Sequence, residues 1–336
     1  MAGKRSIDCL TTGLLTVVSR GALALLLTVA LALLPAFHQA PHEGLTAPQG
    51  AGLALASGVY QWRDEQGRLH FGDRPPETEA AEDLSARYDY RLPFELIIEG
   101  RDYALPVALR QKMEVHVKKI FTIYQQALNI EYQAEQFRIV IYGSETEFRR
   151  YQKRVAPVLE NAAGFYSGAN NQITTWALPN ERVLLGLIVH ECSHAISASG
   201  GHQVATWLNE GLASYFEGIR VAGLSAEVPL PRHWPVLLRR HRFDQRTGAL
   251  ASLIRAPHSQ WYAANGPDNL SYVASASLVW FLLDSEAGRT LLSRLLRTPQ
   301  TDNGVGLINQ HWPGGLNGLE NDWANWLVNA AGTHRY

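Results

Sequence analysis

The chain contains few residues that could cross-link it, since only two of its 336 residues are cysteines, Cys9 and Cys192. Cys9 lies in the N-terminal leader, so removal of the leader would leave no pair for an intramolecular disulfide. The fold must therefore rely on its core alone. A charge excess of either sign is also missing, because the formal net charge is -1. This balance gives no electrostatic reason to expect nucleic acid as a partner, and we predict none.

An uninterrupted apolar run covers residues 21–34, after the basic residues Lys4 and Arg5, and it ends at Pro35. A basic start followed by such a run is typical of an export signal. No clean cleavage site follows, so two alternatives remain for residues 1–40. They form a cleaved signal peptide, or residues 10–34 anchor the chain in the inner membrane. Both alternatives place the body of the protein outside the cytoplasm.

Residues 41–57 are rich in alanine, glycine and proline and are predicted to form a linker. Two short aromatic-rich runs follow within residues 58–76, joined by a turn that ends at Gly67, which predicts a β-hairpin. This segment resembles the envelope-protein module called domain of unknown function 4124, in Tyr60, Trp62, Asp64, Gly67, Phe71, Asp73 and Pro75. The resemblance implies an exported bacterial protein, located in the periplasm or anchored facing it. The hairpin either packs locally or docks an envelope protein partner.

After a second predicted linker at residues 77–93, residues 94–336 are predicted to form the main domain. The fold class is α+β, a small mixed sheet followed by a mostly helical part. Strands are expected at residues 94–100, 137–143 and 172–176, the last as a sheet edge that could pair with an extended substrate. Helices are expected at residues 106–129, from 145, and at 181–199, 206–221, 270–285, 286–297 and 319–330.

The segment His190-Glu191-Cys192-Ser193-His194 lies within the helix expected at residues 181–199. On a helix, residues four apart share a face, so His190 and His194 present two imidazoles to one point. Glu191 points to the side of the pair, near enough to reach a water held by a metal ion. Two ligands and a general base on one rigid element suit metal-dependent peptide hydrolysis. The alternative is a pair of hydrogen-bonded histidines in the core.

A second helix, for which Thr206 is the expected N-cap, carries Glu210 in its first turn. Two antiparallel helices could place Glu210 opposite the two histidines. Two histidines and one glutamate leave the fourth tetrahedral position of Zn²⁺ open, as a catalytic zinc ion requires. We therefore predict a single zinc ion held by His190, His194 and Glu210. The alternative for Glu210 is an acid favoured in the first turn by the helix dipole.

The two segments HECSH, at residues 190–194, and WLNEGLASY, at residues 207–215, look like those of the gluzincin metallopeptidases, the peptidase MA clan. The chain from about Phe94 to Leu283 also resembles the peptidase MA-like family formerly called domain of unknown function 1570. These resemblances imply a zincin-like metallopeptidase that hydrolyses peptide bonds, with Glu191 activating a water held by the zinc. The chain is much shorter than the aminopeptidases of the clan and lacks their Gly-x-Met-Glu-Asn segment, so we expect an endopeptidase acting on peptides or proteins.

The mechanism also needs a donor for the oxyanion of the tetrahedral intermediate. Tyr272 is the first candidate for this catalytic role, with Tyr262 and His258 as alternatives. Asn209 could orient a ligand, and Cys192 is expected to face the core as a small apolar residue. A different class of function stays open: an envelope protein that binds zinc with weak or absent catalysis and docks a partner through its hairpin.

Overall fold

The structure is a computed structural model that describes residues 60–64, 66–72, 80–83, 92–132, 134–159, 162–223, 225–245, 248–263 and 268–336. The predicted leader and first linker lie outside the described residues, as do parts of the hairpin segment and of the second linker. None of the helices in the described ranges has both the length and the apolarity that a membrane span needs. The described chain forms two compact units, and the larger one covers Leu92–Tyr336.

The smaller unit contains a three-stranded antiparallel sheet of β1 (Tyr60–Arg63), β2 (Leu69–Gly72) and β3 (Glu82–Asp83), in the order β2-β1-β3. Asp64 fixes the turn between β1 and β2, because its carboxylate accepts the backbone N–H groups of Gln66 and Arg68 at 3.0 and 2.9 Å. Gly67 supplies the positive φ of 76° that this turn requires. The third strand, β3, lies inside the range predicted to be a linker.

The larger unit begins with a four-stranded sheet in the order β4-β5-β7-β6. Its parallel strands are β4 (Glu95–Arg101), β5 (Gln136–Tyr142) and β7 (Gln172–Trp176), and β6 (Gly164–Ser167) pairs antiparallel with β7. The expectation that residues 172–176 form a sheet edge is wrong, because β6 occupies the free side of β7. The edge strand on this side of the sheet is therefore β6, which packs against the helix at residues 181–198.

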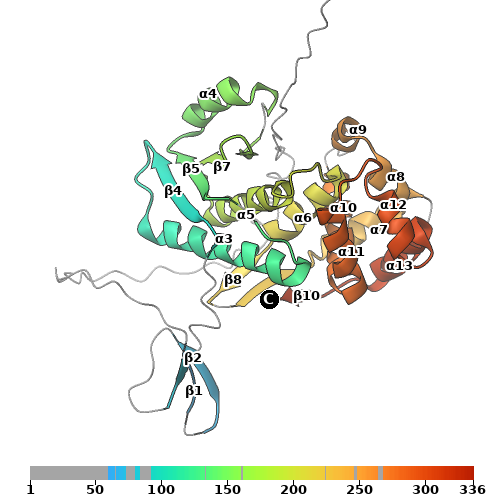
Figure 1. The fold of residues 1–336 in the computed structure, drawn as a ribbon, viewed down its shortest axis with the longest axis horizontal. Coiled ribbons are helices and arrows are strands. Elements are labelled where there is room, and N and C mark those ends of the chain that lie inside the picture. Colours follow the sequence, from blue (N-terminus) through green and yellow to red (C-terminus); the bar gives the residue numbers. More distant parts are fainter. Residues whose placement is uncertain are drawn as a thin grey trace, which may run out of the picture. The chain divides into compact units, whose positions relative to one another are not determined.

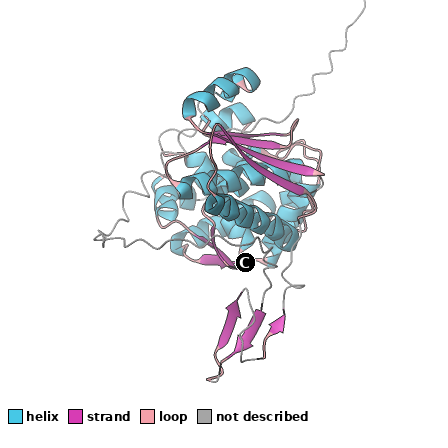
Figure 2. Cartoon of the chain, turned by 90° about the vertical axis from the view of Figure 1, so that its left-hand side faces the viewer, coloured by secondary structure: helices cyan, strands magenta, loops and turns pink. Residues whose placement is uncertain are grey.

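Helices cover both faces of this sheet. Figure 2 shows α4 (Glu145–Val155) on one face and the larger helical part of the unit on the other. Ser144 begins α4 as predicted, since its hydroxyl accepts the backbone N–H of Glu147 at 3.3 Å. On the other face, α3 (Val107–Leu128) packs against α5 (Glu181–Ala198). The predicted helix at residues 106–129 is thus confirmed.

Three helices form the centre of the unit: α5, α6 (Thr206–Glu217) and α10 (Leu270–Leu283), with α6 packed against both of the others (Figure 1). The expected helix at residues 206–221 is too long, because it ends at Gly218 and the chain continues as a strand. Its N-cap is Ala205 rather than the predicted Thr206. The other helices are α7 (His233–Arg240), α8 (Ala249–Arg255), α9 (His258–Ala263), α11 (Glu286–Arg297), α12 (Val305–His311) and α13 (Gly315–Asn329).

The C-terminal end returns to the centre through a second small sheet. Its order is β10-β9-β8, with β8 (Arg220–Ala222), β9 (Ser225–Pro229) and β10 (Thr333–Arg335). His334 stacks on Trp280 of α10 with ring centroids 3.8 Å apart, and its Nδ1 lies 2.6 Å from the hydroxyl of Tyr215 on α6. The α+β prediction, a small mixed sheet and then a mostly helical part, is confirmed.

Candidate metal centre

The central helix α5 begins at a clear capping residue. Asn180 accepts the backbone N–H groups of Arg182 and Val183 at 3.0 and 3.3 Å. Every residue from Val183 to Ser197 is buried, so α5 has no solvent-facing stripe. A helix that is enclosed on all sides in this way holds its side chains rigidly, which is what a ligand site requires.

Three ligand atoms converge between α5 and α6. Glu210 Oε2 lies 3.6 Å from His190 Nε2 and 3.8 Å from His194 Nε2. His190, His194 and Glu210 together form a group that could hold a metal ion. All three side chains are at most 1% exposed. The prediction that Glu210 lies in the first turn of its helix is wrong, because it is the fifth residue of α6, so the alternative of an acid favoured there by the helix dipole does not apply.

The hydrogen bonding of these atoms tests whether they fit a metal ion. Nε2 of both histidines and Oε2 of Glu210 are buried without a hydrogen-bond partner among the described residues. Ligand bonds of about 2.0–2.1 Å separate the ligand atoms of a tetrahedral site by roughly 3.3 Å, which is close to the two observed distances. A metal ion would satisfy all three atoms at once, so the donor set fits.

The outward nitrogens of both histidines face side chains of α6. His190 Nδ1 lies 3.3 Å from Oε2 of Glu217. Asn209 lies near the ring of His194, but neither nitrogen of that ring has a hydrogen-bond partner among the described residues. A partner such as Glu217 fixes the ring orientation and the tautomer of a metal-binding histidine. Asn209 was anticipated from the sequence and Glu217 was not. Glu217 follows Glu210 by seven residues, two helical turns, so the spacing does place both on one face of α6.

The remaining oxygen of Glu210 is also occupied. Its Oε1 accepts the hydroxyl of Tyr262, on α9, at 2.5 Å. Burial raises the pKa of Tyr262 far above its ordinary value, and the nearby Glu210 and Tyr272 raise it further. The hydroxyl therefore keeps its proton and is the donor of this bond.

Electrostatics in the metal-free site follow from burial and from the neighbouring carboxylates. Burial alone would lower the pKa of His190, but Glu210 and Glu217 outweigh it and raise that pKa to about 10. Burial lowers the pKa of His194 to about 4. The pKa of Glu210 lies below its ordinary value because the two histidines and Tyr262 outweigh its burial. Without a metal ion at neutral pH, the ring of His190 is therefore protonated and positively charged, and Glu210 is negatively charged.

Glu191 lies beside the ligands and near the sheet edge. Both of its carboxylate oxygens are buried, and burial raises its pKa to about 8. The backbone N–H of Tyr166, on the edge strand β6, lowers this pKa but does not outweigh the effect of burial. Glu191 is thus a buried carboxyl group that lies beside the potential metal ligands and close to the edge strand β6.

The three candidate oxyanion donors gather in one aromatic cluster. Tyr272, at the start of α10, lies with its ring centroid 6.3 Å from that of Tyr262, and Trp261 contacts both rings. His258 is exposed and packs on Tyr262 at 4.7 Å between centroids. Tyr262 is the member that bonds to a ligand of the triad. Cys192 is wholly buried, as predicted, and burial raises the pKa of its thiol well above its ordinary value.

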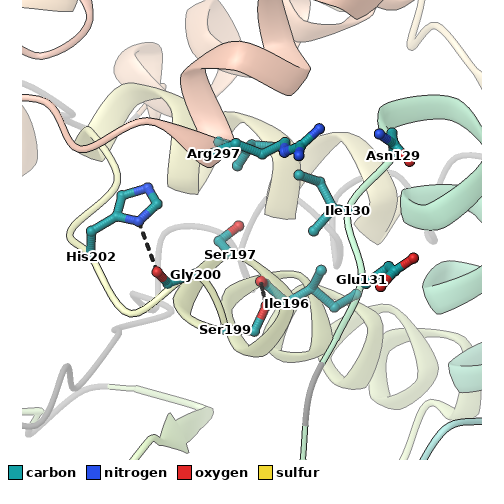
Figure 3. A pocket seen from close by; sticks show the side chains of 10 residues that line it. Asn129, Ile130, Glu131, Ile196, Ser197, Ser199, Gly200, His202 and Arg297 are labelled. Carbon is teal, nitrogen blue, oxygen red and sulfur yellow. Dashed lines mark hydrogen bonds between the residues drawn. The ribbon is translucent and has the colours of Figure 1, made fainter.

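A separate cavity of about 370 Å³ lies where the C-terminal ends of α3, α5 and α11 meet (Figure 3). Figure 3 shows its lining, in which the polar side chains are those of Asn129, Glu131, Ser197, Ser199, His202 and Arg297. None of the three ligand residues contributes to this lining. The cavity is therefore distinct from the triad.

The described chain is thus a mixed α/β protein with a buried site of two histidines and one glutamate that could hold a metal ion. Its residues 50–89 match the family model described as domain of unknown function DUF4124, in agreement with the resemblance noted for the hairpin segment. The matched range contains neither α5 nor α6. A comparison with curated proteins gives no match.

Proposed function

We propose that the protein is an exported, zinc-dependent metallopeptidase, acting as an endopeptidase on peptides or proteins. One observation supports this most strongly: three buried ligand atoms converge without hydrogen-bond partners among the described residues, directly beside the carboxylate of Glu191. A structural zinc site would have four protein ligands, whereas this set of three leaves a position for a reactant. The resemblance of α5 and α6 to the gluzincin segments supports the same conclusion.

His190, His194 and Glu210 would hold the ion. When bound, zinc supplies a Lewis acid that polarises the peptide carbonyl and acidifies a water. Glu191 accepts the proton of the attacking water as the new C–O bond forms. It then delivers that proton to the leaving amine as the C–N bond breaks, so that one carboxylate serves both steps.

The oxyanion requires a donor other than the ligands. The proton of Tyr262 is engaged with Glu210, so Tyr272, its neighbour in the aromatic cluster, remains our candidate for this role. An extended substrate would pair with β6, whose far side from β7 is a free sheet edge and whose Tyr166 amide lies at Glu191. This arrangement would align a scissile bond along the edge strand beside the catalytic carboxylate.

The test compares wild-type protein with Glu191→Gln and Glu210→Ala. Zinc content is measured by elemental analysis, and cleavage of a broad peptide library is measured by mass spectrometry. We expect about one zinc per wild-type chain, zinc retained but cleavage reduced by several orders of magnitude in Glu191→Gln, and zinc lost in Glu210→Ala. Cleavage by zinc-loaded Glu191→Gln at the wild-type rate would contradict the assignment.

The match to DUF4124 favours a second candidate, an envelope protein whose hairpin segment, residues 58–76, docks a partner while the zinc domain turns over little or no substrate. In both versions the chain is exported, either free in the periplasm or held in the inner membrane through residues 10–34. A zinc-loaded wild-type protein that cleaves nothing in the library at high concentration would favour the docking function. Efficient cleavage at a defined set of sites favours the peptidase.

A further inference from the structure

The two carboxylate oxygens of Glu210 have different surroundings. Oε2 faces Nε2 of His190 and of His194, at 3.6 and 3.8 Å. Oε1 points the other way and accepts the hydroxyl proton of Tyr262 at 2.5 Å. The side chain of Glu210 is fully buried, so solvent does not compete for either oxygen.

We propose that Tyr262 is a positioning residue that makes Glu210 bind the metal ion through one oxygen. Its hydroxyl donates a hydrogen bond to Oε1, so that only Oε2 is available as a ligand atom. The proposal rests on the metal site of the proposed function and adds a determinant of its coordination number. A carboxylate without such a donor can bind a metal through both oxygens, as carboxylates often do. In this site a second oxygen would use the position that the reaction needs open.

The placement of Tyr262 is well supported by its neighbours. The adjacent residue Trp261 is 1% exposed, and its backbone carbonyl accepts the hydroxyl of Ser271, at the start of α10, at 3.2 Å. The indole of Trp261 packs edge-on against Tyr272 at 4.8 Å between centroids. These contacts anchor α9 to α10 through Trp261, the residue next to the ring that reaches Glu210. The hydroxyl of Tyr262 is thus held in place before any ion binds.

The experiment replaces zinc with cobalt(II), whose visible absorption is intense in four-coordinate sites and weaker at higher coordination number. Three full-length proteins are compared: wild type, Tyr262→Phe and Tyr272→Phe. Each phenylalanine keeps the ring and its aromatic contacts, and near-ultraviolet circular dichroism checks that the fold is retained. Tyr272→Phe is the matched control, because it removes a hydroxyl from the same aromatic cluster but keeps the hydrogen bond from Tyr262 to Glu210. Cobalt affinity is measured in the same titrations.

For wild type and Tyr272→Phe we expect the intense spectrum of a four-coordinate site. For Tyr262→Phe we expect a weaker visible band and a cobalt affinity changed by about 10- to 100-fold, the usual range when a partner of a ligand is removed. A Tyr262→Phe spectrum and affinity equal to wild type would overturn this inference while leaving the metal site intact. A folded wild-type protein that binds neither cobalt nor zinc would overturn the proposed function as well.

Discussion

Substituting Gly211 with alanine tests whether the close packing of α6 on α10 positions the metal ligand Glu210. A Cβ atom at Gly211 would lie 2.9 Å from the backbone oxygen of Ser275 and 3.1 Å from its Cβ. Ordinary contacts begin near 3.4 Å, so the two helices must separate by about 0.5 Å (3.4 − 2.9). The obstacle is the backbone of a buried residue, so a change of side-chain rotamer cannot relieve it.

Two effects on stability oppose each other at this position. Alanine in a helix interior gains about 1 kcal/mol over glycine, whereas overpacking a core costs about 1–3 kcal/mol. The net loss for the metal-free protein is therefore about 0–2 kcal/mol, and the fold should survive. The effect on the site is larger, because Glu210 is the neighbouring residue and ligand distances tolerate deviations of only about 0.2 Å. We expect zinc affinity to fall by about tenfold or more.

The assays are urea unfolding of the metal-free protein and zinc competition against a chelator of known affinity. The control is Gly218→Ala at the end of the same helix, where φ is -81° and the nearest atom to a new Cβ is 3.9 Å away. It should change stability by no more than about 0.5 kcal/mol and leave zinc affinity unchanged. If Gly211→Ala matched the wild-type stability and zinc affinity, the packing of α6 on α10 would not be what positions Glu210.

Three further predictions concern the surroundings of the site. Glu217→Gln removes the charge beside Nδ1 of His190 and should weaken zinc binding by about 10- to 100-fold, measured by the same competition assay. Zinc binding near pH 7 should release about one to two protons. The reason is that His190 and Glu191, with pKa values of about 10 and about 8, are protonated without metal. The number of protons released is measured by titration calorimetry in buffers of different ionisation enthalpy. Since the ligands bind deprotonated, zinc affinity should rise with pH between about 6 and 8, and a flat profile would contradict these pKa shifts. Deleting residues 333–336 removes β10 and its contacts with α6 and α10, and should lower the melting temperature by several degrees; an unchanged melting temperature would show that this strand does not stabilise the centre.

The sequence was sufficient to predict the helices that carry the ligands. The apolar run before His190, its spacing of four to His194 and the position of Glu210 in the next helix are local patterns, and the structure brings the three residues together. Glu210 lies beyond the first turn of α6, although the sequence analysis placed it within that turn. The end of α6 was predicted less well, because Ile219, Val221 and Ala222 are as apolar as residues of a continuing helix would be. Gly218 ends the helix, and the residues after Ile219 form β8, which pairs with β9.

What the sequence could not predict depends on contacts between distant segments. The identity of the edge strand depends on the sheet order, and the four residues of β6 are too few to show the alternating pattern of a strand. Glu217 lies 27 residues from His190, and Tyr262 lies 52 residues from Glu210. No local pattern distinguishes these two side chains from ordinary surface or core residues. Their roles follow only from the packing of α6 against α5 and from the position of α9.

The burial of charge at this site bears on the choice between a metal centre and a pair of core histidines. Buried ionisable groups are tolerated when they are paired and hydrogen-bonded, and histidines placed in a core for packing would meet that condition. Here Nε2 of both histidines faces a buried carboxylate oxygen beyond good hydrogen-bond distance, and none of these three atoms has a hydrogen-bond partner among the described residues. Meanwhile Glu217 lies 3.3 Å from the outward nitrogen of His190, so this ring is oriented with Nε2 towards Glu210 and His194. A fold that brings three buried polar atoms together without hydrogen bonds to satisfy them is less stable without an ion than with one, and an ion that binds the folded state alone stabilises it. Adding zinc should therefore raise the melting temperature of wild type and leave that of Glu210→Ala nearly unchanged, whereas a pair of core histidines would give no difference between the two proteins.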